Sequence, residues 1–460
     1  MIECTAMKEQ TAVKKSDIDI LSGPIGSALL KFALPLAATG ILQQLFNAAD
    51  VAVVGRFVGK NAMAAVGSNS PIIGLIVNLF LGISLGANVV IANLTGRKDR
   101  EGISRATHTS IITAVISGLV MTTVGELAAE PLLSRLNVPD DVFPMALLYL
   151  RIYIAGLPVI FLYNFESAIF RSQGDTRTPL ICLFISGIIN VILNLFFVLV
   201  LDLKVAGVAL ATIISNLVSS VLLFIKLIRH KGLIKISIKK LKADFHILLR
   251  ILRIGVPAGI QSCVFSLSNI LIQSAINSLG ADVMAASAAA FNIEIVSYFF
   301  LNSFGQACTT FVGQNYGASN IARCKKVTRT SLLMQTLICI AVSALLIATG
   351  KPLLRLFTDD TASGELVRNL GFIRLVYILA PGFINSSIEV LSGALRGYGC
   401  SLPPALASLI GVCGTRITWI YTAFRASRTF ETLLLAYPIS WTVTAAAVTV
   451  IYLVYAGKVK

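Results

Sequence analysis

Twelve long apolar stretches, separated by short polar segments, constrain the fold of this chain more than any other feature. A helix needs about 20 mostly apolar residues to cross the hydrocarbon core of a bilayer. In that core each backbone polar group must find its partner within the protein, which favours helices for stretches of this length. We therefore predict an all-α membrane protein with twelve transmembrane helices, at residues 29–54, 64–94, 107–128, 146–170, 178–201, 205–228, 252–278, 284–314, 328–349, 367–394, 402–423 and 432–456.

The composition excludes the soluble classes of protein. Hydrophobic residues make up 56% of the 460 residues and charged residues only 13%, about half the charged share of a soluble domain. Residues 1–15 are polar and no cleavage site follows a short apolar core, so we expect no cleavable signal peptide. The three His residues are far apart and the eight Cys residues form no CxxC pair, so we expect no resident metal or cofactor.

Lysine and arginine are unevenly distributed along the chain. The net charge is +16, and most of the 38 Lys and Arg residues fall in the N-terminal tail, in every second loop and at the C-terminus. Cytoplasmic loops carry such an excess, so we expect a multi-pass protein of the cell (inner) membrane with both termini in the cytoplasm. No basic patch accompanies stacking aromatic residues, so we expect no nucleic-acid partner. The expected parts are a cytoplasmic N-terminal tail (1–28), an N-lobe (29–228), a basic cytoplasmic linker (229–251) and a C-lobe (252–456).

The two halves of the chain repeat one another at an offset of 221 to 225 residues. Helix-breaking and charged residues recur at this offset, as in the pairs Pro35 and Pro257, Pro158 and Pro381, Glu166 and Glu389, and Pro179 and Pro404. Each half holds six predicted helices, an even number, so both halves have the same topology. We predict two six-helix bundles related by a pseudo-twofold axis along the membrane normal, with a cavity between them that alternating access exposes to either side.

Four carboxylates lie inside predicted helices at four or more residues from either end, where a charge is costly. Two of them, Glu166 and Glu389, are repeat mates, and each precedes an arginine, Arg171 or Arg396, by one or two turns. We expect these acids to extend to the membrane interface or to pair with the basic loops. The four residues together are candidates for a cytoplasmic gate.

The other two carboxylates, Asp50 and Glu294, have no acidic mate, because the corresponding positions are Ile272 and Ile72. The symmetry of the fold therefore does not require these charges. A contact with Arg56 at the interface would explain Asp50 in structural terms, and a buried hydrogen bond would explain Glu294.

Polar residues of two later helices are candidate partners of Asp50. Asn190 and Asn194 are four residues apart and share one helix face, and Thr212 follows in the next helix. Carboxylate, amide and hydroxyl oxygens suit a hard cation or a proton relay, although hydrogen bonding between helices is the common use of such asparagines. We take Asp50, Asn190, Asn194 and Thr212 as the candidate coupling-ion site.

Three segments together resemble the multidrug and toxic compound extrusion (MATE) family: Asn47–Arg56 (NAADVAVVGR), Phe170–Pro179 (FRSQGDTRTP) and Gly313–Ala318 (GQNYGA). The resemblance covers nearly the whole chain. Within the family, the sequence is closer to the branch that contains DNA-damage-inducible protein F. It implies twelve helices in two six-helix lobes. It also implies an antiporter, driven by H⁺ or Na⁺, that exports cationic or amphipathic small molecules.

The resemblance also implies residue roles. Asp50 would be the coupling carboxylate, with Asn190 and Thr212 beside it. The position of Asn194 is usually aspartate in the family, so one acidic ligand is missing and the choice between Na⁺ and H⁺ stays open. The seventh helix offers Gln261 but no carboxylate, and we expect Glu294 and Gln261 to serve coupling or substrate contact in the C-lobe.

A lipid-linked oligosaccharide flippase of the wider superfamily is the alternative function. Its cavity would need several cations to hold pyrophosphate, and we expect the candidates Arg151, Arg374 and Arg416 to extend to the membrane interface instead. An enzyme or ATP-driven pump is not expected, because Gly55–Asn61 has three residues between its glycines and no Ser or Thr after its lysine, unlike a P-loop. We expect a transporter that functions as a monomer in the lipid bilayer.

Overall fold

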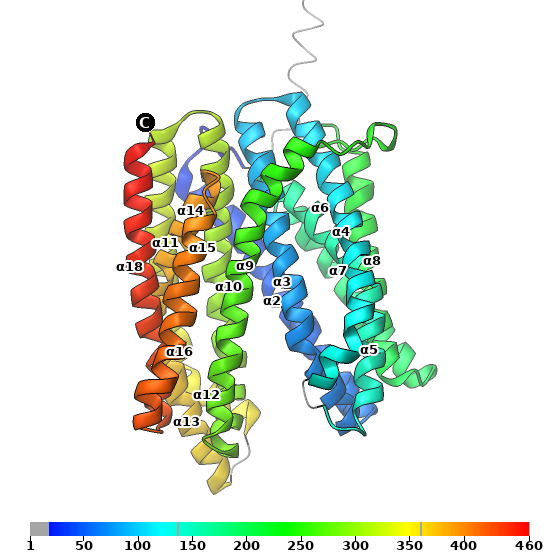
Figure 1. Cartoon of the computed structure of the whole chain (residues 1–460), viewed down its shortest axis with the longest axis vertical. Coiled ribbons are helices and arrows are strands. Elements are labelled where there is room, and N and C mark those ends of the chain that lie inside the picture. Colours follow the sequence, from blue (N-terminus) through cyan, green and yellow to red (C-terminus); the bar gives the residue numbers. More distant parts are fainter. Residues whose placement is uncertain (1–17, 136–137, 359–360, 460) are drawn as a thin grey trace, which may run out of the picture. The chain divides into compact units, whose positions relative to one another are not determined.

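The computed structural model describes residues 18–135, 138–358 and 361–459, without the side chains of residues 240 and 362. The regular secondary structure of these residues is helical (Figure 1). Residues 1–17 of the expected N-terminal tail lie outside the described residues, and residues 18–24 precede the first described helix.

The first half of the chain forms α2 to α8. Its elements are α2 (Ile25–Phe57), α3 (Lys60–Gly96), α4 (Arg100–Arg135), α5 (Phe143–Ala155), α6 (Leu157–Ser172), α7 (Arg177–Leu195), the π-helical segment η1 (Phe196–Val200) and α8 (Lys204–Ile228).

The second half repeats this order with more interruptions. After the short 3₁₀ segment η2 (Ile238–Lys240) come α9 (Phe245–Asn277), α10 (Ala281–Gly317), α11 (Ile321–Ala348), α12 (Gly350–Leu354), η3 (Arg355–Phe357), α13 (Ala362–Leu379), α14 (Gly382–Gly397), α15 (Leu402–Ser408), η4 (Leu409–Gly414), α16 (Thr415–Trp419), η5 (Ile420–Phe424), α17 (Phe430–Leu434) and α18 (Ala436–Lys458).

Nine helices among the described residues are long and apolar enough to cross a membrane, or eleven if each of two bent pairs is one span. The pairs are α5 with α6, bent by 47°, and α13 with α14, bent by 43°. Pro158 follows the first break and Pro381 lies in the second, and proline bends a helix because it lacks an N–H donor and collides with the preceding turn. The helical run from α15 to η5 accounts for the remaining predicted segment, so the prediction of twelve helices is confirmed.

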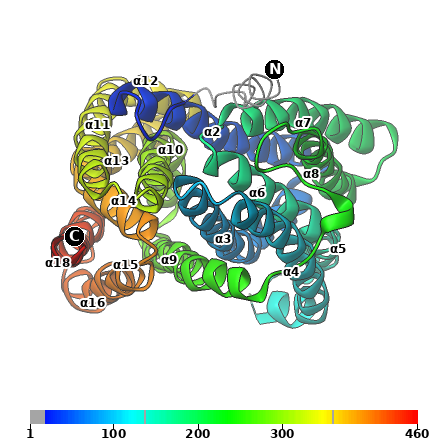
Figure 2. The ribbon, with the colours of Figure 1, turned by 90° about the horizontal axis from the view of Figure 1, so that it is seen from above.

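The described helices pack into two compact units. The first holds Ala38–Leu252 with the short stretch before α2, and the second holds Ile25–Ala37 with Arg253–Lys460. In the first unit α6 packs against α3, α4 and α8, and in the second α14 packs against α10, α11 and α18 (Figure 2). Because equivalent helices pair in both units, the predicted pair of like bundles is confirmed.

The start of α2 differs from the expected lobe boundary at residue 29. Leu29, Phe32 and Ala33 are fully buried, and the ring of Phe32 meets Phe311 of α10 edge-on, with ring centroids 5.6 Å apart. This apolar packing places the first turns of α2 in the second unit, while the rest of the helix belongs to the first.

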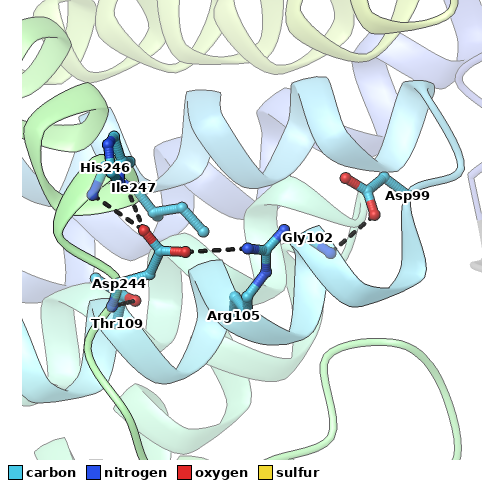
Figure 3. Close-up of polar contacts among 7 residues, drawn as sticks. All are labelled: Asp99, Gly102, Arg105, Thr109, Asp244, His246 and Ile247. Carbon is cyan, nitrogen blue, oxygen red and sulfur yellow. Dashed lines mark hydrogen bonds and ion pairs between the residues drawn. The ribbon is translucent and has the colours of Figure 1, made fainter.

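The linker between α8 and α9 ends in a helix cap. Asp244 Oδ1 accepts hydrogen bonds from the backbone N–H groups of His246 at 3.0 Å and Ile247 at 3.2 Å (Figure 3), which satisfies donors that the first turn of α9 leaves free. Residues 245–251 of the expected linker are therefore helical. Asp244 Oδ2 lies 3.2 Å from Nη1 of Arg105 in α4. The N–H group of Ile247, and to a lesser degree the Arg105 guanidinium, hold the pKa of the Asp244 carboxyl below its ordinary value.

A histidine of α4 holds the middle of the linker. His108 Nδ1 lies 2.7 Å from the carbonyl oxygen of Ser104, and its Nε2 lies 3.1 Å from the backbone nitrogen of Ser237. A carbonyl only accepts and an amide N–H only donates, so these partners assign the proton to Nδ1 and the acceptor role to Nε2. Thr109 Oγ1 accepts a further bond from the Asp244 amide at 3.0 Å. The linker is thus docked on α4 by backbone as well as side-chain contacts.

Candidate functional site

Asp50 of α2 is buried in the first unit, with 6% of its surface exposed. Both of its carboxylate oxygens accept hydrogen bonds from later helices: Oδ1 from Asn194 Nδ2 of α7 at 2.5 Å, and Oδ2 from Thr212 Oγ1 of α8 at 3.0 Å. Among the described residues these neutral donors replace the alternative contact with Arg56, whose side chain is exposed. The structure therefore brings three helices of one unit together at a single carboxylate.

The two asparagines of α7 form a short chain of amides. Asn194 Nδ2 also donates to Asn190 Oδ1 at 3.2 Å, as their spacing of one helical turn predicts. Asn194 Oδ1 is buried and has no hydrogen-bond partner among the described residues. An unsatisfied buried acceptor is unusual and costs free energy, and here it lies on the side chain that binds Asp50. All four residues of the candidate coupling-ion site are thus neighbours.

The hydroxyl of Thr212 has two acceptors within reach. Its Oγ1 lies 3.0 Å from Asp50 Oδ2 and 3.0 Å from the carbonyl oxygen of Val208 in the preceding turn. A hydroxyl has one hydrogen, so it donates to one of these oxygens at a time. The hydroxyl can serve the carboxylate when Asp50 is charged and the backbone when it is neutral.

The surroundings of this polar group are apolar. A cluster of buried side chains from α2, α3, α5, η1 and α8 packs in the same unit: Val53, Val54, Ala62, Val66, Tyr149, Val198, Val205, Val208 and Ala209. Tyr149 stacks on Tyr153 with ring centroids 6.3 Å apart, and both lie within electrostatic range of Asp50. Sequence reasoning missed these tyrosines, although their spacing of four residues was a visible signal.

Glu294 of α10 has a different environment in the second unit. Arg374 of α13 binds it with two hydrogen bonds, Nη2 to Oε1 at 2.7 Å and Nε to Oε2 at 3.2 Å. Both side chains are nearly buried. Glu294 is therefore committed to an ion pair, which sequence reasoning did not foresee because the two residues are 80 positions apart.

Gln261 of α9 does not join Glu294. Its Nε2 donates to Ser408 Oγ at 2.8 Å, and its Oε1 accepts from Arg396 Nη1 at 3.3 Å. The structure thus connects one of the expected C-lobe coupling residues with one of the expected gate residues.

The repeat-mate acids differ in burial, because Glu166 is fully buried and Glu389 is half-buried. Glu166 is fully buried and accepts a hydrogen bond from Ser220 Oγ at 2.9 Å, so the expectation that it extends to the interface is wrong. Glu389 packs against Gly305 of α10. A Cβ added at Gly305 would lie 3.1 Å from the carbonyl oxygen of Glu389 and 3.1 Å from its Oε2. Glu389 also interacts electrostatically with Arg396. Glu389 thus packs α14 against α10 beside Arg396, and Glu166 joins α6 to α8 through Ser220.

The expectation that three arginines extend to the membrane interface is wrong for two of them. Arg374 and Arg416 are 4% and 2% exposed, because each has polar partners within the bundle. The side chain of Arg151 is 48% exposed and lies 3.8 Å from Glu126 and 3.6 Å from Glu130, and its extension to the interface stays a prediction.

A duplicated six-helix unit of membrane-spanning helices, with a buried acid among polar side chains, defines a polytopic membrane transporter. The family model MatE matches this chain twice, over residues 35–196 and 257–422, once in each half. The chain therefore belongs to the MatE family, whose members are transporters and not enzymes.

Individual proteins agree with the family assignment. The chain is 28% identical to "Probable multidrug resistance protein NorM" of Thermotoga maritima, over 85% of this chain and 84% of that protein. It is 27% identical to "Probable multidrug resistance protein YoeA" of Bacillus subtilis, over 84% of each chain. The structure titled "Outward-facing conformation of a multidrug resistance MATE family transporter of the MOP superfamily" superposes with a TM-score of 0.89 at 22% identity, over 97% of this chain and 99% of the other. This last likeness establishes the fold.

Proposed function

We propose that this protein is a cation-coupled antiporter that exports cationic or amphipathic small molecules by alternating access. The observation that carries the proposal is the buried carboxylate of Asp50, held by Asn194 and Thr212 in an apolar part of the first unit. The relatives named as multidrug resistance proteins support the substrate class.

The mechanism follows from the cost of a buried charge. A carboxylate in an apolar region is stable only if a proton, a cation or a cationic substrate neutralises it. If these states exclude one another, entry of the coupling cation expels the substrate, and the gradient of one drives export of the other. Because Asp50 has no acidic mate in the second half, one carboxylate links both events.

The residues around Asp50 suit either coupling cation. Na⁺ prefers hard oxygen ligands, which the Asp50 carboxylate, Asn190 Oδ1 and the unpartnered Asn194 Oδ1 would supply. A proton needs only Asp50, with the Thr212 hydroxyl turning between its two acceptors. In both cases the bound cation is itself transported in the exchange.

The polar groups around Glu166 and Glu389 support a gate. Glu389, Arg396 and Gln261 interact within the second unit, and Glu166 and Arg171 stand at the corresponding positions of the first. We place these groups on the cytoplasmic side, with both termini cytoplasmic, in a monomer of the cell (inner) membrane, as the distribution of Lys and Arg favours.

Transport in proteoliposomes tests the proposal. Imposing a proton gradient or a sodium gradient separately shows which cation drives efflux of a cationic dye. Asp50→Asn should abolish gradient-driven efflux, while the matched control Asp141→Asn should leave it unchanged, because this exposed carboxylate accepts only from Asn61 among the described residues. Efflux that survives in the Asp50→Asn protein would remove this carboxylate from the mechanism.

One observation favours the alternative flippase: the buried Arg374 and Arg416 are cations inside the second unit. A lipid-linked oligosaccharide presents a pyrophosphate that guanidinium groups bind. Movement of such a lipid across the same vesicles, without dye efflux, would decide for this second function.

A further inference from the structure

A group of polar residues around a buried arginine belongs entirely to the second unit. It consists of Arg416 of α16, Tyr437 and Ser440 of α18, and Asn269 of α9, and Arg374 of α13 adjoins it. We call these residues the Arg416 cluster. Arg416 is only 2% exposed and is the largest of the fully buried side chains of the described residues.

The partners of Arg416 are all neutral. Its Nε donates to Ser440 Oγ at 3.2 Å and its Nη1 donates to Asn269 Oδ1 at 2.9 Å. The ring of Tyr437 covers one face of the guanidinium, with Cζ 4.4 Å from the ring centroid. No described residue accepts a hydrogen bond from Nη2. One nitrogen with two N–H donors is therefore available for a further acceptor.

The carboxylate of this region is already used. Both oxygens of Glu294 accept hydrogen bonds from Arg374, and Arg374 lies 5.9 Å from the same tyrosine ring that stacks on Arg416. The two arginines and one glutamate leave an excess of one positive charge. A charge buried without a counter-charge costs several kcal/mol, and buried charges in proteins are normally paired.

The repeat places Arg416 at the helix position of Asn190, one of the candidate coupling-ion residues of the first unit. Pro179 and Pro404, at the starts of the equivalent helices, are 225 residues apart, and Asn190 and Arg416 are 226 apart. The π-helical segment η4 lies between Pro404 and Arg416, and a π turn holds about one residue more than an α turn. Arg416 therefore occupies the helix position of Asn190, with the opposite preference for charge.

We propose that the Arg416 cluster binds an oxyanion, namely the carboxylate or phosphate group of a solute or of a lipid headgroup. The planar guanidinium suits such a group through Nη2. Asn269 is exposed, so the anion would enter the cluster from the side of this residue. All of these residues belong to the second unit, so the proposal does not depend on the exchange at Asp50.

The chain carries its own probes for this site. Trp419 and Trp441 are its two tryptophans. Trp419 follows Arg416 by three residues in α16, and Trp441 packs edge-on against Tyr437 with ring centroids 5.9 Å apart. The full-length protein in nanodiscs of neutral phosphatidylcholine is titrated with acetate and with inorganic phosphate at constant ionic strength. We expect a saturable change in tryptophan fluorescence.

Two variants assign that change to the cluster. Arg416→Gln removes the guanidinium and should abolish the response. Asn269→Asp keeps the acceptor for Nη1 but supplies an internal carboxylate, so it should lower the apparent affinity at least about tenfold even if Arg416→Gln fails to fold. The matched control Asn277→Asp makes the same change at an exposed site of α9 and should behave as the unaltered protein. A response that Asn269→Asp leaves unchanged would overturn the proposal.

Lipid composition separates the two sources of the oxyanion. A response to acetate or phosphate in neutral nanodiscs assigns the site to a solute. A tryptophan signal that instead requires phosphatidylglycerol in the nanodisc, and that Asn269→Asp removes, assigns it to a headgroup. Absence of any response in both kinds of nanodisc would contradict the proposal, whereas Asp50→Asn should leave the response intact.

Discussion

Replacing Thr212 by valine should increase the affinity of the Asp50 site for its coupling cation. The Thr212 hydroxyl donates to the charged carboxylate at 3.0 Å, but it has the Val208 carbonyl at the same distance when Asp50 is neutralised. A hydrogen bond to a charged group contributes about 2 kcal/mol and a neutral one about 1 kcal/mol. The variant therefore loses about 1 kcal/mol more from the charged state than from the neutralised state.

This difference converts into a measurable shift. Since 1.36 kcal/mol corresponds to a factor of ten, the half-saturating concentration of the coupling cation should fall about fivefold. Dye efflux from proteoliposomes, measured against the concentration of H⁺ or Na⁺ that drives it, gives this value directly. Thr123→Val is the matched control, because Thr123 is exposed and, within the described part of the chain, donates only to the Leu119 carbonyl of its own helix. A variant that transports with an unchanged or higher half-saturating concentration would refute the proposed role of the hydroxyl.

Three further predictions concern packing and the linker. Gly393→Ala should destabilise the second unit by about 1–3 kcal/mol, seen as a lower melting temperature, because its Cβ would collide with the Gly305 carbonyl oxygen. Glu294→Gln should lower the free energy of unfolding by about 3–5 kcal/mol, because it leaves the Arg374 charge buried and unpaired. The melting temperature again measures this loss. The N–H donors at the start of α9 lower the pKa of Asp244. The linker should therefore stay docked above pH values near the ordinary carboxyl pKa of about 3.9 and loosen as the pH falls through the lowered pKa. Hydrogen exchange of the linker amides measures this loosening.

The two packing predictions have matched controls, and all three predictions have a contrary result. Gly414→Ala adds a methyl group that meets no described atom within 4 Å beyond its chain neighbours and the backbone of its own helix, so its melting temperature should stay within about a degree of the unaltered protein. Glu126→Gln changes an exposed ion pair and should cost far less than the buried one. Equal effects for a variant and its control would contradict the packing argument. Linker exchange that is independent of pH in the acid range, or that slows as the pH falls, would contradict the role of Asp244.

The helices and their duplication were predictable because each depends on local pattern. An apolar run of sufficient length has few alternatives to a membrane helix, and prolines such as Pro158 and Pro381 recur where each half bends its fourth helix. The sequence was less informative about the beginning of α2, because the burial of Phe32 depends on Phe311, a residue far along the chain.

The Asp50 site was also predictable, for a different reason. A spacing of four residues placed Asn190 and Asn194 on one face, and the missing repeat mate made Asp50 conspicuous. Contacts between distant helices were not predictable in this way: the pairing of Glu294 with Arg374 and of Gln261 with Arg396 depends on the relative rotation of helices, which hydrophobic pattern alone leaves undetermined.

The most direct measurement of the central claim is substrate exchange, followed with and without an imposed cation gradient and together with the release of protons or sodium. Proteoliposomes loaded with labelled cationic substrate are placed in unlabelled substrate, and the Asp50→Asn protein is compared with the unaltered one. The account predicts that the variant neither responds to an imposed H⁺ or Na⁺ gradient nor releases protons or sodium when substrate binds. Binding of substrate that still displaces one coupling cation per molecule in the variant would show that a different residue couples the two movements.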